Sequence, residues 1–158
     1  MVGAAATLVA SWIPTRAQHR VADDDRKERK AEVLRAASAE YLVSVDSFID
    51  AARELVYRIV HDAPELERES AHEAYLRDWQ RVQCACAPVE IAGPSDLGAR
   101  ASELKLQLGS VANVCDKWHD AVKHGPTRSR VSQFDAAWES ADKARTAFVS
   151  TAHAYAYQ

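Results

Sequence analysis

Hydrophobic residues recur along most of the chain at alternating spacings of four and three residues. In the stretch 15–63 the series is unbroken and consists of Leu34, Ser38, Tyr41, Val45, Phe48, Ala52, Leu55 and Ile59. The stretch 95–124 contains an equally regular series of Leu97, Ala101, Leu104, Leu108, Val111, Cys115, Trp118 and Val122. A repeat of about 3.5 residues predicts a helix with a single apolar stripe. We therefore expect both stretches to be helices that bury this stripe.

Two further stretches show the same spacing in a shorter or interrupted form. In 65–87 the series is Tyr75, Trp79, Val82 and Cys86. In 127–158 it is Val131, Phe134, Trp138, Ala141, Arg145, Phe148, Ala152 and Tyr155, with one arginine as a polar interruption. Apolar stripes on consecutive helices joined by short loops are typical of antiparallel bundles. The predicted fold class is all-α, an antiparallel up-down four-helix bundle over residues 34–158.

Proline and glycine separate these stretches. They occur at Pro14, Pro64, Pro88, Gly93-Pro94 and Gly125-Pro126. Because proline lacks the N–H that a helix interior needs, we expect a break at each of these positions. The chain has only five glycines and five prolines in 158 residues. That scarcity argues against an all-β fold, which requires frequent turns, and against a glycine-rich nucleotide-binding domain.

The first stretch is longer than a bundle of this size requires. As a helix, residues 15–63 would span roughly 73 Å, whereas the other three would span roughly 35–47 Å. Its apolar series begins only at Leu34, and residues 15–33 carry closely mixed acidic and basic side chains instead. Opposite charges at helical spacing predict a solvated helical stalk over 15–33. A disordered leader is the alternative interpretation.

Residues 1–14 form an apolar segment without charges, followed by Arg16 and Arg20. Twelve residues of helix cover about 18 Å, less than the roughly 30 Å of a hydrocarbon core. Three interpretations remain open: the end of a transmembrane helix that starts upstream, a short interfacial anchor, or an apolar leader packed on the bundle. In the two membrane interpretations the anchoring side chains are Leu8, Val9, Trp12 and Ile13. Basic residues after the segment predict a membrane-associated protein with its bundle on the cytoplasmic side.

Two sequence segments carry a resemblance to other proteins. The first is GAAATLVASW followed by TRAQHR and a charged helix, over residues 3–20, and the second is the VEIAGP turn at 89–94. This pattern resembles the small uncharacterised membrane-anchored helical proteins of actinobacteria. The resemblance implies a Gly/Ala-rich transmembrane segment, an arginine-rich helix and a helical bundle. It implies no catalytic activity.

Charge and cysteine content narrow the range of partners. The net charge of −3 excludes a globally basic nucleic-acid-binding protein, so we expect no nucleic-acid partner. Three cysteines are an odd number without the spacing of a disulfide scaffold. This cysteine content is typical of a reducing compartment and agrees with a cytoplasmic bundle.

Cys84, Cys86, Cys115 and His119 are residue types that bind zinc. In an antiparallel helix pair, however, Cys115 would lie roughly 30 Å along its helix from the loop that Cys86 precedes. One metal ion could not contact both positions. Cys86 and Cys115 also occupy apolar stripe positions, where cysteine acts as a small hydrophobic residue. We therefore predict no zinc site in this set and no cofactor.

Several histidines and aspartates are expected at one end of the bundle, where the first and third helices finish. They are His61, Asp62, His119, Asp120 and His124. Metal-dependent phosphohydrolases of the HD type use His-Asp pairs, so this set is an alternative metal site. The competing interpretation is that these histidines lie near helix C-termini and interact favourably with the helix dipole.

The turn at Gly125-Pro126 is locally basic. Lys123, His124, Arg128 and Arg130 form a candidate interaction site for an acidic partner or a nucleic acid, and a solvated loop is the alternative.

The leading functional hypothesis is a non-enzymatic, membrane-anchored bundle that acts as a cytoplasmic protein-interaction or scaffold module. Its protein partner is unknown, and self-association through the stalk is a further expectation. The alternative is a soluble metal-dependent helical enzyme that uses the His-Asp set.

Overall fold

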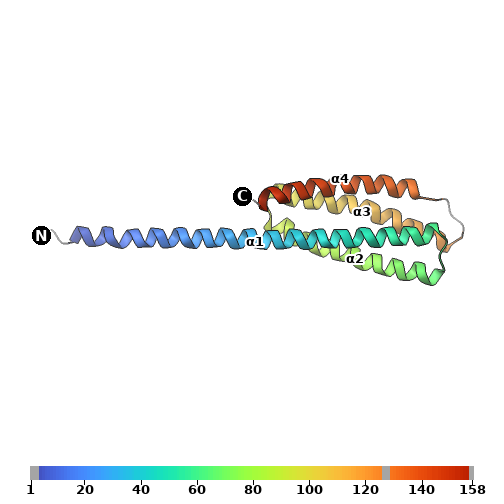
Figure 1. The fold of residues 1–158 in the computed structure, drawn as a ribbon, viewed down its shortest axis with the longest axis horizontal. Helices are drawn as coiled ribbons and strands as arrows, with labels where there is room; N and C mark the ends of the chain where they lie inside the picture. Colours follow the sequence, from blue (N-terminus) through green and yellow to red (C-terminus); the bar gives the residue numbers. More distant parts are fainter. Residues whose placement is uncertain (1–3, 126–128, 157–158) are drawn as a thin grey trace. The chain divides into compact units, whose positions relative to one another are not determined.

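The computed structural model describes residues 4–125 and 129–156, and their side chains from residue 21 to residue 155. These residues form four helices, α1 (Ala4–Val60), α2 (Glu65–Ala92), α3 (Ser95–Lys123) and α4 (Val131–Ala156) (Figure 1). No strand occurs in this described part of the chain. The predicted all-α fold class is therefore confirmed. The chain divides into two compact units, Met1–Val33 and Leu34–Gln158.

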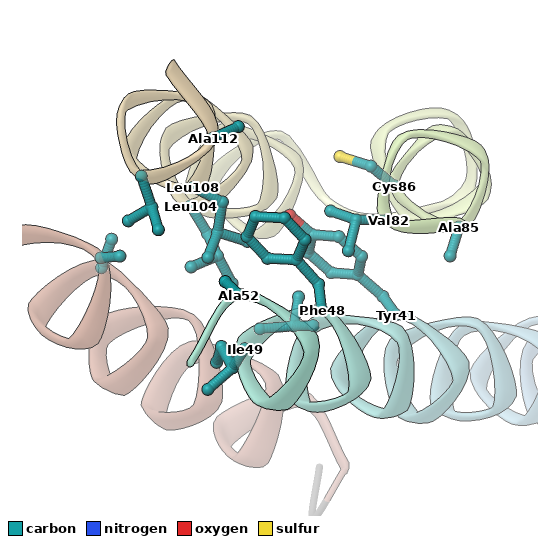
Figure 2. Close-up of a cluster of buried hydrophobic side chains, with 14 of the residues drawn as sticks. Tyr41, Phe48, Ile49, Ala52, Val82, Ala85, Cys86, Leu104, Leu108 and Ala112 are labelled. Atoms are coloured by element: carbon teal, nitrogen blue, oxygen red, sulfur yellow. The ribbon is translucent and has the colours of Figure 1, made fainter. Parts of the chain in front are cut away.

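The core of the second unit is built from the four apolar stripes. Within the first and third stripes, every residue from Ser38 to Ile59 and from Leu97 to Trp118 is buried. Figure 2 shows Tyr41 and Phe48 pointing from α1 into the space among the helices. Leu104 and Leu108 of α3 and Val82 of α2 point into the same space. The four–three spacing therefore identified the buried face of α1 and of α3. In the second and fourth series it was only partly correct, because Val131 is exposed and Trp79 and Trp138 are half-buried.

Aromatic contacts join α1 to its two neighbours in the bundle. The Phe48 ring lies 5.5 Å from the Tyr75 ring and 5.1 Å from the Trp79 ring, both on α2. On the α4 side, the Tyr41 and Phe148 rings meet edge to face at 5.3 Å. Such pairs contribute about 0.5–1.5 kcal/mol beyond the burial of their area.

The buried tyrosine hydroxyls bind helix α3. The Tyr41 hydroxyl donates a hydrogen bond to the Ala101 carbonyl, and the Tyr75 hydroxyl donates one to the Ala112 carbonyl, each at 3.0 Å. Burial is the main cause that raises the pKa of both tyrosines. Each hydroxyl therefore stays protonated and serves as a donor, which satisfies a polar group that would otherwise be costly to bury.

Polar contacts explain the interruption in the α4 stripe. Arg145 donates two hydrogen bonds to the carboxylate of Asp46 on α1, at 3.0 and 3.2 Å. Near the end of the same stripe, the Tyr155 hydroxyl donates to the carboxylate of Asp96 on α3 at 2.7 Å. α4 thus contacts both α1 and α3 through polar groups at the edge of the core.

The expected helix break at Pro88 is wrong. Pro88 lies inside α2, which continues to Ala92, and Gly93 is the residue at its C-terminal end. Proline removes the hydrogen bond to the carbonyl four residues earlier, here that of Cys84. Because Cys84 and Pro88 are both exposed, water can hydrogen-bond to that carbonyl. Most of the segment 89–94, expected to be a turn, is consequently helical.

The expected break at Pro14 is also wrong, because α1 begins at Ala4 and includes this proline. A proline within a helix removes one backbone hydrogen bond, and strong helix formers within one turn of it, such as Ala10 and Ala17, favour continuation. The charged residues 15–33 are helical as predicted, and residues 21–30 are all exposed.

Over the residues that the structure describes, no helix combines the length and the apolarity needed to cross a membrane.

Candidate functional site

A cluster of ionisable side chains lies between the first turns of α2 and the last turns of α3. Its members are Glu69 and His72 on α2 and Asp116 and His119 on α3. In each helix the carboxylate precedes the histidine by three residues, a spacing that places both on one helical face. The two helices are antiparallel, so these two faces meet at the same end of the bundle.

The two histidines lie against each other, and each approaches a carboxylate of the opposite helix. The rings of His72 and His119 stack at a centroid distance of 3.8 Å and an interplanar angle of 16°. His119 Nε2 lies 3.4 Å from a Glu69 oxygen, and His72 Nε2 lies 3.6 Å from an Asp116 oxygen. The potential ligand atoms of Glu69, His72 and His119 all fall within 4.8 Å of one another.

Two polar atoms of this cluster are buried without a hydrogen-bond partner. They are Nδ1 of His119, a side chain that is only 1% exposed, and Oδ1 of Asp116. The Asp116 atom is the oxygen that His72 Nε2 approaches at 3.6 Å, a contact slightly longer than a hydrogen bond. A buried polar atom without a partner costs about 1–3 kcal/mol, and in native proteins such atoms call for a specific explanation. A bound ion or water molecule beside His119 Nδ1 would provide the partner that this atom lacks.

The charge states of the cluster follow from burial and from Lys123. Burial, followed by the nearby His72 and Lys123, lowers the pKa of His119, and the weaker effects of Glu69 and Asp120 oppose this shift. The Lys123 ammonium donates to Glu69 at 2.9 Å and is the first cause that lowers the pKa of that carboxyl group. At neutral pH the cluster therefore offers a neutral imidazole beside an ionised carboxylate, the forms that bind divalent cations.

The lowered pKa of His119 predicts a loss of stability in acid. In the presence of a chelator, we expect the free energy of unfolding to fall as the pH drops below about 6.5, the ordinary pKa of histidine. In that range the unfolded chain binds a proton that the folded chain does not, so protonation favours unfolding by up to about 1.4 kcal/mol per pH unit. Urea denaturation at a series of pH values measures the effect. His119→Gln should flatten the dependence and His124→Gln, an exposed control, should not; equal slopes in both would contradict the prediction.

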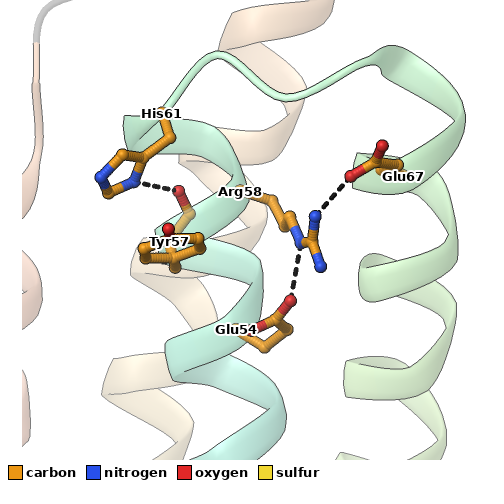
Figure 3. Close-up of polar contacts among 5 residues, drawn as sticks. All are labelled: Glu54, Tyr57, Arg58, His61 and Glu67. Atoms are coloured by element: carbon orange, nitrogen blue, oxygen red, sulfur yellow. Dashed lines mark hydrogen bonds and ion pairs between the residues drawn. The ribbon is translucent and has the colours of Figure 1, made fainter.

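The five residues of the predicted His-Asp set do not come together. His61 is exposed, and its Nδ1 pairs with the Tyr57 carbonyl at 2.9 Å (Figure 3). Asp62 has a positive φ of 49° and accepts a hydrogen bond from Arg68 at 3.3 Å. The remaining residues Asp120 and His124 are exposed. Only His119 belongs to the cluster, because its helix turns that residue toward α2 rather than toward the end of α1.

The basic turn is partly neutralised within the bundle. Lys123 pairs with Glu69, His124 is exposed, and Arg130 is half-buried. Arg128 lies outside the described residues.

The predicted anchor residues Leu8, Val9, Trp12 and Ile13 fall within α1, but their side chains are outside the part of the chain that the structure describes.

The three cysteines are free, with Cys84 exposed and Cys86 and Cys115 buried. Burial raises the pKa of Cys86 to about 11 and that of Cys115 to about 12, so both thiols are protonated at neutral pH. A buried, protonated thiol acts as an apolar group and is a poor nucleophile.

Sequence reasoning missed Glu69, His72 and Asp116. It assigned the first and third helices to this end of the bundle and left out the start of the second helix, which an antiparallel topology places there too. The apolar stripe of 65–87 also carried a signal, because a step of three residues back from Tyr75 reaches His72. His119 directly follows Trp118, another stripe residue, and is therefore expected to lie at the edge of the core.

Comparison of the chain with known protein families, with curated proteins and with solved structures found no match.

Proposed function

We propose that this protein is a non-enzymatic helical bundle attached to a membrane by its N-terminal apolar segment. In this proposal the bundle lies on the cytoplasmic side and is available to protein partners. The observation that carries the proposal concerns the first unit, Met1–Val33, whose described residues 4–33 form a single helical segment.

The exposure of this helical segment supports a role as a spacer and not as part of the folded core. All side chains from residue 21 to residue 30 are exposed, and Val21 and Val33 are 61% and 59% exposed. A helix that buries none of these side chains gains little stability from packing, and isolated helices are only marginally stable in water. A charged, exposed helix that follows an apolar segment suits a spacer between an attachment point and a folded unit.

The apolar segment and its flanking charges support membrane attachment. Leu8, Trp12 and Ile13 would enter the lipid interface, with Trp12 at the level of the headgroups. Arg16 and Arg20 would then contact anionic headgroups. The free cysteines agree with a cytoplasmic bundle.

The interior of the bundle is a packed apolar core. Its largest fully buried side chains are apolar or aromatic apart from His119. Self-association through the charged segment stays a prediction. The sequence offers it little support, because the four–three series of α1, continued before Leu34, reaches Lys27 and Asp24. Their charges disfavour burial against a second copy of the chain.

Vesicle flotation tests the attachment. The full chain should float with vesicles of phosphatidylcholine and phosphatidylglycerol, and the double variant L8S/W12S should bind at least about tenfold more weakly. Burial of one large apolar side chain contributes about 1.5–3 kcal/mol, and about 1.4 kcal/mol corresponds to a factor of ten.

The matched control is V21S/V33S, which removes two exposed apolar side chains from the same unit but from outside the apolar segment. This control should float like the unmodified chain. Failure of the unmodified chain to float, or equal flotation of L8S/W12S, would overturn the proposal.

A further inference from the structure

We propose that Glu69, His72 and His119 form a binding site for a divalent transition-metal cation of the zinc class. The inference is independent of membrane attachment, because all three residues lie in the second unit. It differs from the predicted His-Asp set in every residue except His119.

The donor set suits such a cation. Two imidazoles and one carboxylate match the nitrogen and oxygen ligands that zinc takes at about 2.0–2.2 Å. Tetrahedral bonds of that length place ligand atoms roughly 3.4 Å apart. The ligand atoms of Glu69, His72 and His119 already lie within 4.8 Å of one another. Side-chain rotations that shorten the largest separation by up to about 1.4 Å would complete the distances. The rotations must also unstack the two imidazole rings, because each nitrogen lone pair lies in the plane of its ring.

A buried nitrogen of His119 points to a ligand. The His119 side chain is only 1% exposed, and its Nδ1 has no hydrogen-bond partner. A neutral imidazole carries a lone pair on one of its ring nitrogens, and a metal cation can accept that lone pair. Oδ1 of Asp116 also makes no hydrogen bond, but it already has a polar neighbour in His72 Nε2 at 3.6 Å.

Lys123 supplies the positive charge of the cluster in the metal-free state. Its ammonium lies 2.9 Å from the Glu69 oxygen, the same oxygen that His119 Nε2 approaches at 3.4 Å. Lys123 is exposed and lies in the last turn of α3, so its flexible side chain can move into solvent. A cation bound at Glu69 would displace this ammonium, so Lys123 competes with the metal.

Isothermal titration of the full chain with Zn²⁺ tests the site. We expect one equivalent to bind, and His72→Gln to weaken binding at least about tenfold, which corresponds to about 1.4 kcal/mol. His119→Gln should have a similar effect. His72 lies at the half-buried edge of the cluster, so its variant remains informative if the more deeply buried His119→Gln fails to fold. Circular dichroism verifies the fold of each variant.

Two control variants separate this site from other zinc ligands. His61→Gln removes an exposed histidine outside the cluster and should bind like the unmodified chain. Cys84→Ser removes the exposed thiol and should also leave the affinity unchanged. In contrast, Lys123→Met should strengthen binding about tenfold, because it removes the competing charge from Glu69.

Three results of these titrations would overturn the proposed metal site. Absence of stoichiometric binding by the unmodified chain would overturn the proposal, as would unchanged affinity in a folded His72→Gln variant. Loss of binding in Cys84→Ser would assign the metal to a thiol and would also overturn it. None of these results depends on whether the chain floats with vesicles.

Discussion

Phe48→Ala should lower the free energy of unfolding by about 3–5 kcal/mol, the usual range for removal of a buried phenylalanine ring. The Phe48 side chain is fully buried, and its ring contacts Tyr75 and Trp79 of α2 at centroid distances of 5.5 and 5.1 Å. The substitution therefore leaves a cavity where α1 meets α2 and removes two aromatic contacts. The loss is a large share of the 5–15 kcal/mol that stabilises a typical domain.

Urea denaturation followed by circular dichroism measures this loss as a decrease in the midpoint concentration. The matched control is Val43→Ala on the same helix, because the Val43 side chain is 66% exposed. Its effect should stay within about 0.5 kcal/mol, as for most surface substitutions. A loss below about 1 kcal/mol in Phe48→Ala would show that Phe48 does not lie in a packed core.

Gly98→Leu should destabilise the bundle by about 1–3 kcal/mol, the usual cost of overpacking. Gly98 is buried on α3, and a Cβ added there would lie 3.4 Å from the Glu90 carbonyl oxygen and 3.5 Å from its Cα. These atoms belong to the α2 backbone, so the rest of a leucine side chain could be accommodated only if the two helices separated. That steric cost exceeds the roughly 0.8 kcal/mol that leucine gains over glycine in helix propensity.

A second glycine on α3 provides a control with the opposite sign. An added Cβ at Gly109 would make ordinary contact with the Trp79 ring at 3.8 Å. Gly109→Ala should therefore stabilise the protein by about 0.5–1 kcal/mol through helix propensity. Thermal unfolding of both variants measures the difference. An increased melting temperature in Gly98→Leu would contradict the close approach of α2 and α3 at this position.

The prediction of the fold from sequence succeeded where the physical cause is local. The four–three spacing of Tyr41, Val45 and Phe48 sets the buried face of a helix by geometry alone, and these side chains are buried. The polar interruption at Arg145 did not break the fourth helix, because the residue lies at the edge of the core and pairs with Asp46. That partner is 99 residues away in the sequence and could not be identified from spacing.

The prediction failed at Pro88, where a local rule depends on the surroundings. Proline removes one helical hydrogen bond wherever it occurs, but the cost depends on whether the freed carbonyl can reach water. Cys84 is exposed, and this exposure follows from the packing of α2 and not from the residues near the proline.

In the candidate site, too, some features follow from local sequence and others only from tertiary packing. The sequence by itself determined the helices, their apolar stripes and the ionisable residue types near one end of the bundle, because helical periodicity depends only on spacing along the chain. Only the tertiary structure brought His72 against His119 and left His61 outside at the surface. The reason is that the axial offset and the rotation of two packed helices are set by side-chain interlocking along their whole length. One turn of displacement, about 5.4 Å, would separate the two imidazoles.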